Sequence, residues 1–391
     1  MGIILYKGNF KMVIYLDNAA TTKPCDAAIK ALNECLTENF GNPSSLHTLG
    51  LNAQKTVEKS RRSIASALGC DTSEITFTSC ATESTNTVLK GAALKYGKRK
   101  KKIITSSVEH SSVRECMKYL SENGFEIVYI SPREDGLFYA EDFINAADEK
   151  TCLVSMMLVN NENGCILPVG KTFKTLKRRY PDIICHCDAV QGFMKIPVKI
   201  RELSCDLLSL SAHKIYAPKG IGVMYIKKGI IIHPLLLGGG QENKQRSGTE
   251  SVPLIAAFGA AVDFLSPIMK NNLEHYENLR NHLTEKLSEN ENIKINYDKG
   301  VPYIMSISVP GIRSEIMLHT LEKSQIYVSS GSACSKGKSS GVLEEFGADA
   351  VAADSTLRLS FSYETTTEML DIFAEKLFEA QKTLSSVINK K

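Results

Sequence analysis

The sequence predicts a protein of the α/β class, with a large domain built on a mostly parallel sheet and a smaller α+β domain. The chain has 391 residues, more than one compact core usually holds, and 43% of them are hydrophobic. Short apolar strand patterns alternate with amphipathic helix patterns as far as residue 226. Beyond about residue 250 this alternation stops and a long helical pattern begins.

Each element of the large domain is predicted from its periodicity and its boundary residues. Two amphipathic helices, over residues 24–39 and 50–68, come first, and Gly69 is a typical residue for ending the second. Strands and helices then alternate along the chain. The predicted strands cover residues 75–78, 102–106, 125–130, 152–159, 183–187, 207–210 and 222–226, and the predicted helices between them include residues 82–95 and 111–122.

The second half of the chain predicts a smaller α+β unit. Its elements are a continuous helical pattern over 252–288, strand patterns at 293–297 and 304–309, a helix at 314–323 and a last helix from residue 366 onward. We therefore expect residues 25–265 to form the large domain and residues 12–24 with 266–391 to form the small one. Residues 1–11 are expected to be an N-terminal extension.

The composition argues against some classes of binding partner. Lys and Arg number 47 against 43 Asp and Glu, so the net charge of +4 is too small to indicate a nucleic acid or an anionic membrane. The most apolar segment, residues 230–237, is broken by His233 and Pro234 and is too short to span a bilayer. Eleven cysteines without a regular framework, and no secretory signal pattern, predict a reducing, cytoplasmic location.

Lys214 is the first candidate for catalysis. It follows an apolar run and lies on a turn that ends in Gly220. His213 directly precedes it, Ser211 lies three residues before it, and Asp188 lies further upstream. A lysine can carry pyridoxal phosphate as a Schiff base, and an aspartate can keep the pyridine nitrogen protonated. Taken alone, the short motif fits an ordinary solvated lysine better.

Further polar residues follow the carboxyl ends of predicted strands, which meet at one edge of a parallel sheet. The Ala81 amide and Thr82 hydroxyl enter a helix and could bind a phosphate, or Thr82 or Ser79 could simply cap that helix. His110 could lie on an aromatic cofactor and move protons, although a lone histidine there is more often structural. Asn161 could orient substrate or cofactor, or belong to a polar turn.

Three more parts of the sequence have side chains that could bind the cofactor or the substrate. Gln191 lies one turn beyond Asp188 and could donate to the phenolic oxygen of the cofactor, the alternative being capping chemistry at Asp188. Arg358 could pair with a substrate carboxylate, or be a surface arginine on a strand. The glycine-rich segment 238–249, with Arg246 and Thr249, could approach a phosphate or form a flexible hairpin.

A metal site is not expected. Cys185 and Cys187 lie on one face of a strand and His186 and Asp188 on the other, so the four side chains cannot converge on one ion.

Cys334 stands in a segment of small residues, 329–341, with lysines nearby. We expect an exposed cysteine on a mobile loop near positive charge, and these conditions favour the thiolate. A buried structural cysteine would need apolar neighbours, which this segment lacks.

Taken together, these residues resemble the NifS/IscS-type cysteine desulfurases, class V aminotransferase relatives among the fold-type I pyridoxal phosphate enzymes. The resemblance runs from about residue 13 to the last helix. It is carried by Tyr15-Leu-Asp-Asn-Ala-Ala-Thr-Thr22, Phe40-Gly-Asn-Pro-Ser-Ser45 with His47, Ala81-Thr-Glu83, Glu109-His110, Val159-Asn-Asn-Glu162, Asp188-Ala-Val-Gln191, Ser211-Ala-His-Lys214, Arg246-Ser-Gly-Thr249 and Ser329-Ser-Gly-Ser-Ala-Cys334.

The resemblance implies a homodimer with its active site at the subunit interface. Lys214 would carry the cofactor, Asp188 would pair with its ring nitrogen, His110 would stack on the ring and Gln191 would contact the ring oxygen. The implied phosphate ligands are Ala81, Thr82, Ser211, His213 and, from the other subunit, Thr249. The implied substrate ligands are Asn161, Arg358 and Asn42.

The implied reaction converts L-cysteine to L-alanine and leaves a persulfide on Cys334, for delivery to an iron–sulfur scaffold or a tRNA-thiolation enzyme. Two features depart from the usual pattern, namely the basic residues after Cys334 and Ala212 at a position that is often glycine. The alternatives are a selenocysteine lyase or another fold-type I enzyme, and a non-catalytic scaffold of the same fold. An intact Lys214, Asp188 and Cys334 disfavours the scaffold.

Overall fold

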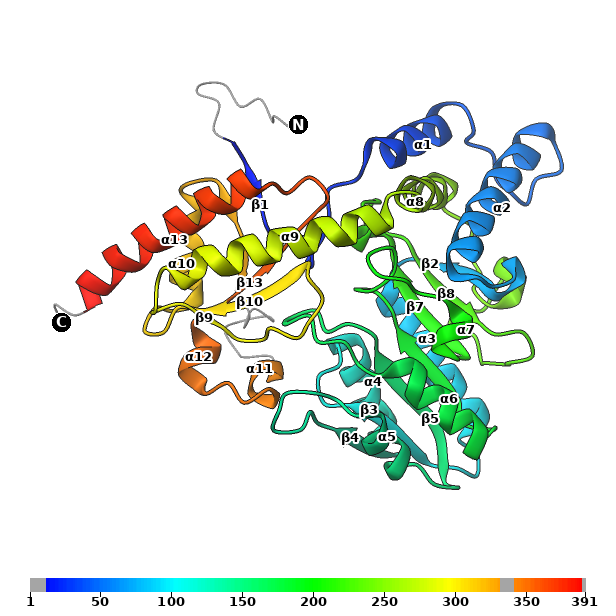
Figure 1. The fold of residues 1–391 in the computed structure, drawn as a ribbon. Coiled ribbons are helices and arrows are strands. Elements are labelled where there is room, and N and C mark those ends of the chain that lie inside the picture. The colour runs from blue at the N-terminus through cyan, green and yellow to red at the C-terminus, as the bar shows by residue number, and fades with distance from the viewer. Residues whose placement is uncertain (1–11, 331–340, 389–391) are drawn as a thin grey trace.

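The computed structural model describes residues 12–330 and 341–388, which are organised around one large sheet and two smaller ones (Figure 1). The large sheet has seven strands in the order β2-β8-β7-β6-β5-β3-β4. These are β2 (Ile75–Thr78), β3 (Lys102–Ser106), β4 (Glu126–Ile130), β5 (Thr151–Met157), β6 (Ile184–Asp188), β7 (Leu207–Ser211) and β8 (Gly222–Ile226). Only β8 runs against its neighbours, so the prediction of a mostly parallel sheet is confirmed.

Helices bury both faces of the large sheet. Neighbouring residues of one strand enter different cores: Ile103 and Leu207 belong to one apolar cluster, Ile104 and Leu208 to the other. The helices of this part are α1 (Asp26–Thr37), α2 (Thr48–Leu68), α3 (Ala81–Tyr96), α4 (Ser111–Glu122), α5 (Ala140–Ala146), α6 (Val169–Arg179), α7 (Ile200–Leu203) and α8 (Val252–Leu265), with 3-10 turns η1 (Thr72–Glu74), η2 (Ala212–Lys214) and η3 (Glu242–Lys244). Since α3 and α4 supply one cluster and α5, α6 and α8 the other, the sheet is a buried middle layer.

The smaller sheets join the two ends of the chain. An antiparallel sheet has the order β12-β13-β10-β9, and β1 pairs in parallel with β11. The elements are β1 (Ile14–Tyr15), β9 (Lys294–Ile295), β10 (Ile304–Ser308), β11 (Ile326–Tyr327), β12 (Ser329–Ser330), β13 (Thr356–Ser360), α10 (Ser314–Glu322), α11 (Val342–Glu345), α12 (Ala350–Asp354) and α13 (Thr367–Ile388). After β1, a parallel bridge joins Asp17 to Ser360 of β13, and the carbonyl oxygen of Ala19 accepts a hydrogen bond from Gln191, which follows β6 of the large sheet.

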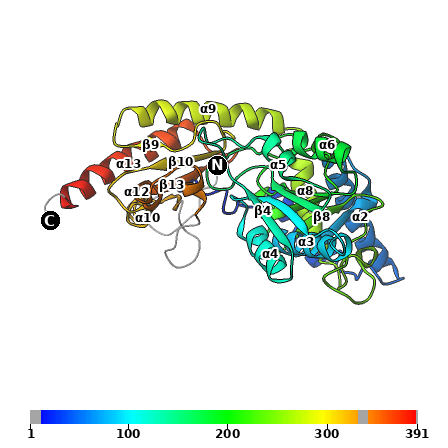
Figure 2. The same cartoon turned by 90° about the horizontal axis from the view of Figure 1, so that it is seen from below.

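The helix predicted over residues 252–288 is wrong as a single element. It is divided into α8 and α9 (Met269–Ser288), which are bent by 73° with respect to each other. Pro267 lies in the break and cannot donate the hydrogen bond that would continue α8. Figures 1 and 2 show α9 passing from the side of the large sheet to the small one, where it packs against α13.

Among the described residues, no single helix is both long and apolar enough to cross a membrane.

The limits predicted for the two domains remain a prediction.

Candidate active site

A cavity of about 360 Å³ lies where the carboxyl ends of β2, β3, β5, β6 and β7 meet. Most of the predicted site residues line it, although they come from distant parts of the chain. These residues are Ala81, Thr82, His110, Asn161, Asp188, Gln191, Ser211, His213, Lys214 and Arg358. The cavity is also lined by Ala19, Ala20 and Cys80, for which no role was predicted.

Lys214 ends the 3-10 turn η2, directly after β7. Its Nζ donates hydrogen bonds to the carbonyl oxygens of Ala19 at 2.6 Å and Ala20 at 2.7 Å. Burial lowers the pKa of Lys214 to about 8, with the positive charge of Arg358 acting in the same direction. Lys214 is therefore no ordinary solvated lysine, and a useful fraction of it is a neutral amine near neutral pH.

Asp188 and His110 face the same cavity. Asp188 is the last residue of β6 and accepts a hydrogen bond from the amide of Val190 at 3.0 Å. Burial raises the pKa of Asp188, and the nearby imidazole of His110 opposes that rise. A cationic nitrogen placed against this carboxylate would offset the cost of burying it.

His110 caps a helix and also lines the cavity. It is the N-cap of α4, where Nδ1 accepts a hydrogen bond from the amide of Ser112 at 3.2 Å, so the structural interpretation is confirmed. Because Nδ1 accepts, the proton of the neutral ring must be on Nε2. Burial lowers the pKa of His110, which favours this neutral ring.

Several of the groups that line the cavity are neutral and could donate hydrogen bonds. The N-cap residue of α3 is Cys80, which makes no side-chain capping bond to a described residue, so capping by Thr82 or Ser79 is wrong. The buried Oγ of Ser211 also has no hydrogen-bond partner among the described residues. Burial lowers the pKa of His213 to about 4, so its ring is neutral at pH 7. A free helix N-terminus with an unused hydroxyl fits a phosphate group.

Arg358, on β13, brings the small sheet into the site. Its side chain is buried, so the interpretation as a surface arginine is wrong. One guanidinium nitrogen, Nη2, donates to Asp17 Oδ1 at 2.8 Å, and Nη1 donates to the carbonyl oxygen of Asn161 at 3.0 Å. The buried Nε has no hydrogen-bond partner among the described residues and could donate to a carboxylate.

The remaining predicted residues are not brought into this cavity. Asn42 lies in the turn before α2, where its Oδ1 accepts from the amide of Ser44. Asn42 and Thr249 do not line the cavity, which is formed here by the described residues of a single chain. Cys334 lies outside the described residues. The roles of these three residues remain predictions.

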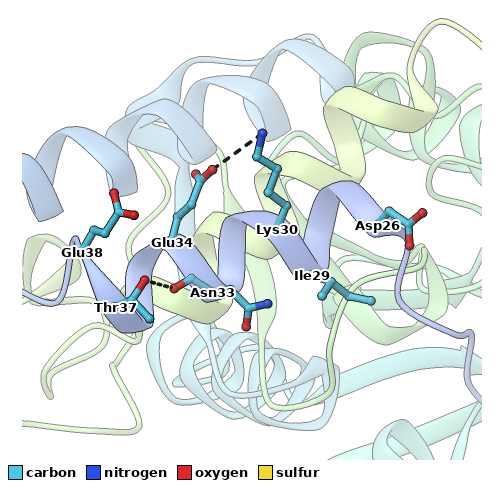
Figure 3. Close-up of a pocket in the computed structure, with 7 residues that line it drawn as sticks. All are labelled: Asp26, Ile29, Lys30, Asn33, Glu34, Thr37 and Glu38. Atoms are coloured by element: carbon cyan, nitrogen blue, oxygen red, sulfur yellow. Dashed lines mark hydrogen bonds and ion pairs between the residues drawn. The ribbon is translucent and has the colours of Figure 1, made fainter.

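Two other kinds of site, a metal centre and a second hollow, add no residues to this cavity. Within residues 12–330 and 341–388, no three His, Cys, Asp or Glu side chains are grouped as a metal site would require. A hollow along α1 is lined by residues such as Ile29 and Asn33, with Lys30 paired to Glu34 at 3.9 Å (Figure 3). It shares no residue with the cavity around Lys214.

The cavity residues fit pyridoxal phosphate. Lys214 offers an amine of lowered pKa, and Asp188 offers a buried carboxylate that needs a cation. The unused Ser211 hydroxyl and the free N-terminus of α3 suit a phosphate. Each of these groups is suited to bind a different part of that cofactor.

Comparison with known proteins agrees with this geometry. The family model for aminotransferase class-V matches residues 14–373. A cysteine desulfurase IscS of Dictyoglomus turgidum is 38% identical over 384 residues, which cover 96% of this chain and 97% of the relative. A solved NifS-like protein has a TM-score of 0.90 at 38% identity and covers 96% of this chain and 100% of its own. A structure of SspA in complex with cysteine has a TM-score of 0.76 at 30% identity and covers 89% and 98%, respectively.

Proposed function

Because this chain belongs to the aminotransferase class-V family, we propose that it is a pyridoxal phosphate-dependent cysteine desulfurase, which converts L-cysteine to L-alanine. The names of its relatives support this activity, as does a related structure with cysteine bound. The main observation behind the proposal is a single cavity that combines the Lys214 amine with Asp188, His110 and Arg358.

Bound pyridoxal phosphate would supply an electron sink for the amino acid's α-carbon. Asp188 would hold the ring nitrogen by its carboxylate, and His110 would cover the ring. Ser211, His213 and the first residues of α3, Ala81 and Thr82, would hold the phosphate through neutral donors. Gln191 would direct an N–H of its carboxamide to the ring oxygen.

Lys214 would act both as an amine and as a base. Its pKa of about 8 leaves part of the side chain neutral at pH 7, so it can accept the α-proton of the substrate. Arg358 would bind the substrate carboxylate through its unpaired Nε, and Asn161 lies beside it. This pair fixes the amino acid so that its α-proton faces the lysine.

Cys334 would receive the sulfur. Its thiolate attacks the sulfur of the substrate, so an S–S bond forms and the substrate's C–S bond breaks. The electron pair of the C–S bond passes to the carbon skeleton, which takes up protons and leaves as L-alanine. In balance, L-cysteine and the Cys334 thiol give L-alanine and a Cys334 persulfide.

We propose a homodimer in which each chain completes the other chain's site. Asn42 and Thr249 are polar residues of the family motifs, yet neither lines the cavity of its own chain. Large apolar side chains lie exposed near both: Phe40 is 66% exposed, Leu46 is fully exposed and Leu237 is 83% exposed. An interface of this kind would bury them and carry Thr249 to the partner's phosphate.

The persulfide would pass to an acceptor protein, either an iron–sulfur scaffold or a tRNA-thiolation enzyme, without direct contact with nucleic acid or membrane. We place the enzyme in the cytoplasm. The cysteines of the described segments are all free thiols, and most are buried, as expected in a reducing compartment.

The test is to supply L-cysteine and a reductant, and to measure alanine, sulfide and the mass of the Cys334 peptide. Cys334→Ala should abolish the persulfide while pyridoxal phosphate still binds. Lys214→Ala should abolish alanine formation. Selenocysteine in place of cysteine, with selenide measured, distinguishes a selenocysteine lyase.

Two cysteine variants sharpen this assignment. Cys70 lies outside the cavity, and burial raises the pKa of its thiol to about 12, so Cys70→Ala should be active. Cys80 lines the cavity and is the rival acceptor. If sulfur transfer survives in Cys334→Ala and stops in Cys80→Ala, the assignment to Cys334 is wrong.

A further inference from the structure

Lys195 is a buried lysine for which the proposed mechanism has no use. It lies in the turns that follow β6, and only 4% of its surface is exposed. No carboxylate lies within ion-pair distance of it in the part of the chain that the structure describes. Its Nζ instead donates to Gln191 Oε1 at 3.2 Å and lies 5.1 Å from the centre of the Tyr303 ring. A lysine amine is costly to bury and needs hydrogen-bond partners there, which makes its contact with Gln191 important.

Gln191 links this lysine to the cavity. While Oε1 accepts from Lys195, Nε2 donates to the carbonyl oxygen of Ala19 at 2.9 Å. The same oxygen of Ala19 accepts from Lys214 at 2.6 Å. A continuous series of hydrogen bonds therefore joins the two buried amines through one carboxamide and one carbonyl group.

This series permits only one orientation of the carboxamide. If Gln191 were flipped, its oxygen would face the oxygen of Ala19 and the two would repel each other. Its N–H groups would face the amine of Lys195, which repels them when it is protonated. The other end of the residue is fixed as well, because the hydroxyl of Tyr303 donates to the backbone oxygen of Gln191 at 2.8 Å.

The charges around Lys195 are also positive. Burial lowers the pKa of Lys195 to about 7, and Lys214 and Arg358 act in the same direction. Tyr303 is the other titratable neighbour; burial raises the pKa of its hydroxyl, which stays neutral. Lys195 is thus placed where its charge acts on the same site as Lys214.

We propose that Lys195 is a positioning residue of the active site. It holds the carboxamide of Gln191 so that the N–H groups, and not the oxygen, are presented to the cavity. This inference rests on the proposed function, because Gln191 is assigned there to the ring oxygen of the cofactor. It adds a residue that touches neither substrate nor cofactor.

The test uses the holoenzyme and its cofactor-free form. Lys195→Met removes the donor while keeping much of the volume. It should weaken binding of pyridoxal phosphate by about tenfold, the value of one well-oriented hydrogen bond. It should also move the pH midpoint of the bound cofactor's visible absorption upward, because the positive charge that Lys195 carries near and below pH 7 is lost. Lys102→Met, at a lysine paired with Asp148 outside the cavity, should change neither quantity.

A double-mutant cycle separates positioning from a structural role. In a Gln191→Ala background, Lys195→Met should weaken cofactor binding by about twofold or less. An equal loss in both backgrounds would overturn the proposal, and so would an unchanged affinity and midpoint in Lys195→Met.

Gln191→Glu covers the case in which Lys195→Met fails to fold. The new carboxylate still accepts a hydrogen bond from Lys195 but has no N–H group to present to the cavity. Gln191→Glu should therefore weaken cofactor binding as much as Gln191→Ala does. Binding equal to that of the wild type would contradict the proposal. If the wild-type protein bound no cofactor, the proposed function itself would be wrong.

Discussion

The carboxylate of Asp17 lies 2.8 Å from Nη2 of Arg358, although 341 positions separate the two residues in the chain. The contact joins the opening segment to β13, and both side chains are largely withdrawn from solvent. Asp17 therefore balances the charge of the arginine that we assign to the substrate. It also acts on Lys214, because its negative charge favours the protonated amine.

Replacing Asp17 by Asn should lower the pKa of Lys214 further below its value of about 8. Capture of pyridoxal phosphate by the cofactor-free protein requires the neutral amine. The pH midpoint of the capture rate should therefore fall, by about half a unit for a partly screened charge pair. Asp182→Asn, in a surface pair with Lys100, is the control. A midpoint that stayed in place or rose would contradict the assignment.

Arg358→Gln should impair binding of L-cysteine. The variant loses a charged donor in a buried site, and such hydrogen bonds contribute about 1.5–3 kcal/mol, so KM should rise by about tenfold to a hundredfold. Cofactor binding should change much less, because Arg358 is not assigned to the cofactor. Steady-state alanine production, measured beside cofactor titration, separates the two effects. A normal KM would show that the substrate carboxylate binds elsewhere.

His186 should make the protein sensitive to acid. It is fully buried between Ser155 and Ser209, and burial lowers its pKa from 6.5 to about 3. The unfolded chain takes up the proton first as the pH falls. The stabilising contribution of the neutral ring is thus present above pH 6.5 and is lost progressively toward pH 3.

The check is urea unfolding of wild type and His186→Gln at several pH values. At about 1.4 kcal/mol for each pKa unit, the wild type should lose about 2 kcal/mol more than the variant between pH 6.5 and about pH 5. Parallel losses in the two proteins would mean that the buried imidazole does not control this range.

The sequence predicted the parallel strands well for a physical reason. Strands such as β3 and β7 are buried on both faces, so adjacent apolar residues such as Ile103-Ile104 and Leu207-Leu208 mark them in the sequence. The opposite direction of β8 could not be predicted, because direction depends on pairing with distant strands. The division of residues 252–288 was missed because the apolar pattern continues across Pro267.

The site was predictable to a similar degree. Residues at the carboxyl ends of parallel strands meet at one edge, and this placed Lys214, Asp188 and His110 together. The contribution of Asp17 was missed, because nothing local indicates a contact with Arg358. Lys195 was missed for another reason, since a lysine in a sequence is most simply interpreted as solvated.

Arg61 and Glu242 form a buried ion pair that should be essential for stability. Nη2 of Arg61 donates to Oε1 at 2.8 Å and Nη1 donates to Oε2 at 2.9 Å, while Glu242 also accepts from the amide of Phe77. Arg61→Met leaves a buried carboxylate unpaired and should lower the free energy of unfolding by about 3–5 kcal/mol.

Adding Glu242→Gln should recover part of that loss in urea unfolding, since it removes the uncompensated charge. Lys30→Met breaks the exposed pair of Figure 3 and should change the free energy of unfolding by at most about 1 kcal/mol. Equal losses at the buried and the exposed pair would contradict this distinction.

Gly222→Ala should damage the part of the cavity to which we assign the phosphate. A Cβ at Gly222 would lie 2.6 Å from the carbonyl carbon of Cys80 and 2.8 Å from the carbonyl oxygen of Leu210. Both are backbone atoms, so the turn between β2 and α3 must move, and with it the amides of Ala81 and Thr82.

We expect the free energy of unfolding to fall by about 1–3 kcal/mol and cofactor affinity to fall by about tenfold. Gly229→Ala is the matched control, because its Cβ would meet nothing within 4 Å but the residue has a φ of +89°. It should cost about 1–2 kcal/mol of backbone strain and leave cofactor affinity unchanged. Cofactor titration and urea unfolding of both variants give the answer: if Gly222→Ala binds pyridoxal phosphate as tightly as the wild type, the N-terminus of α3 does not hold the phosphate.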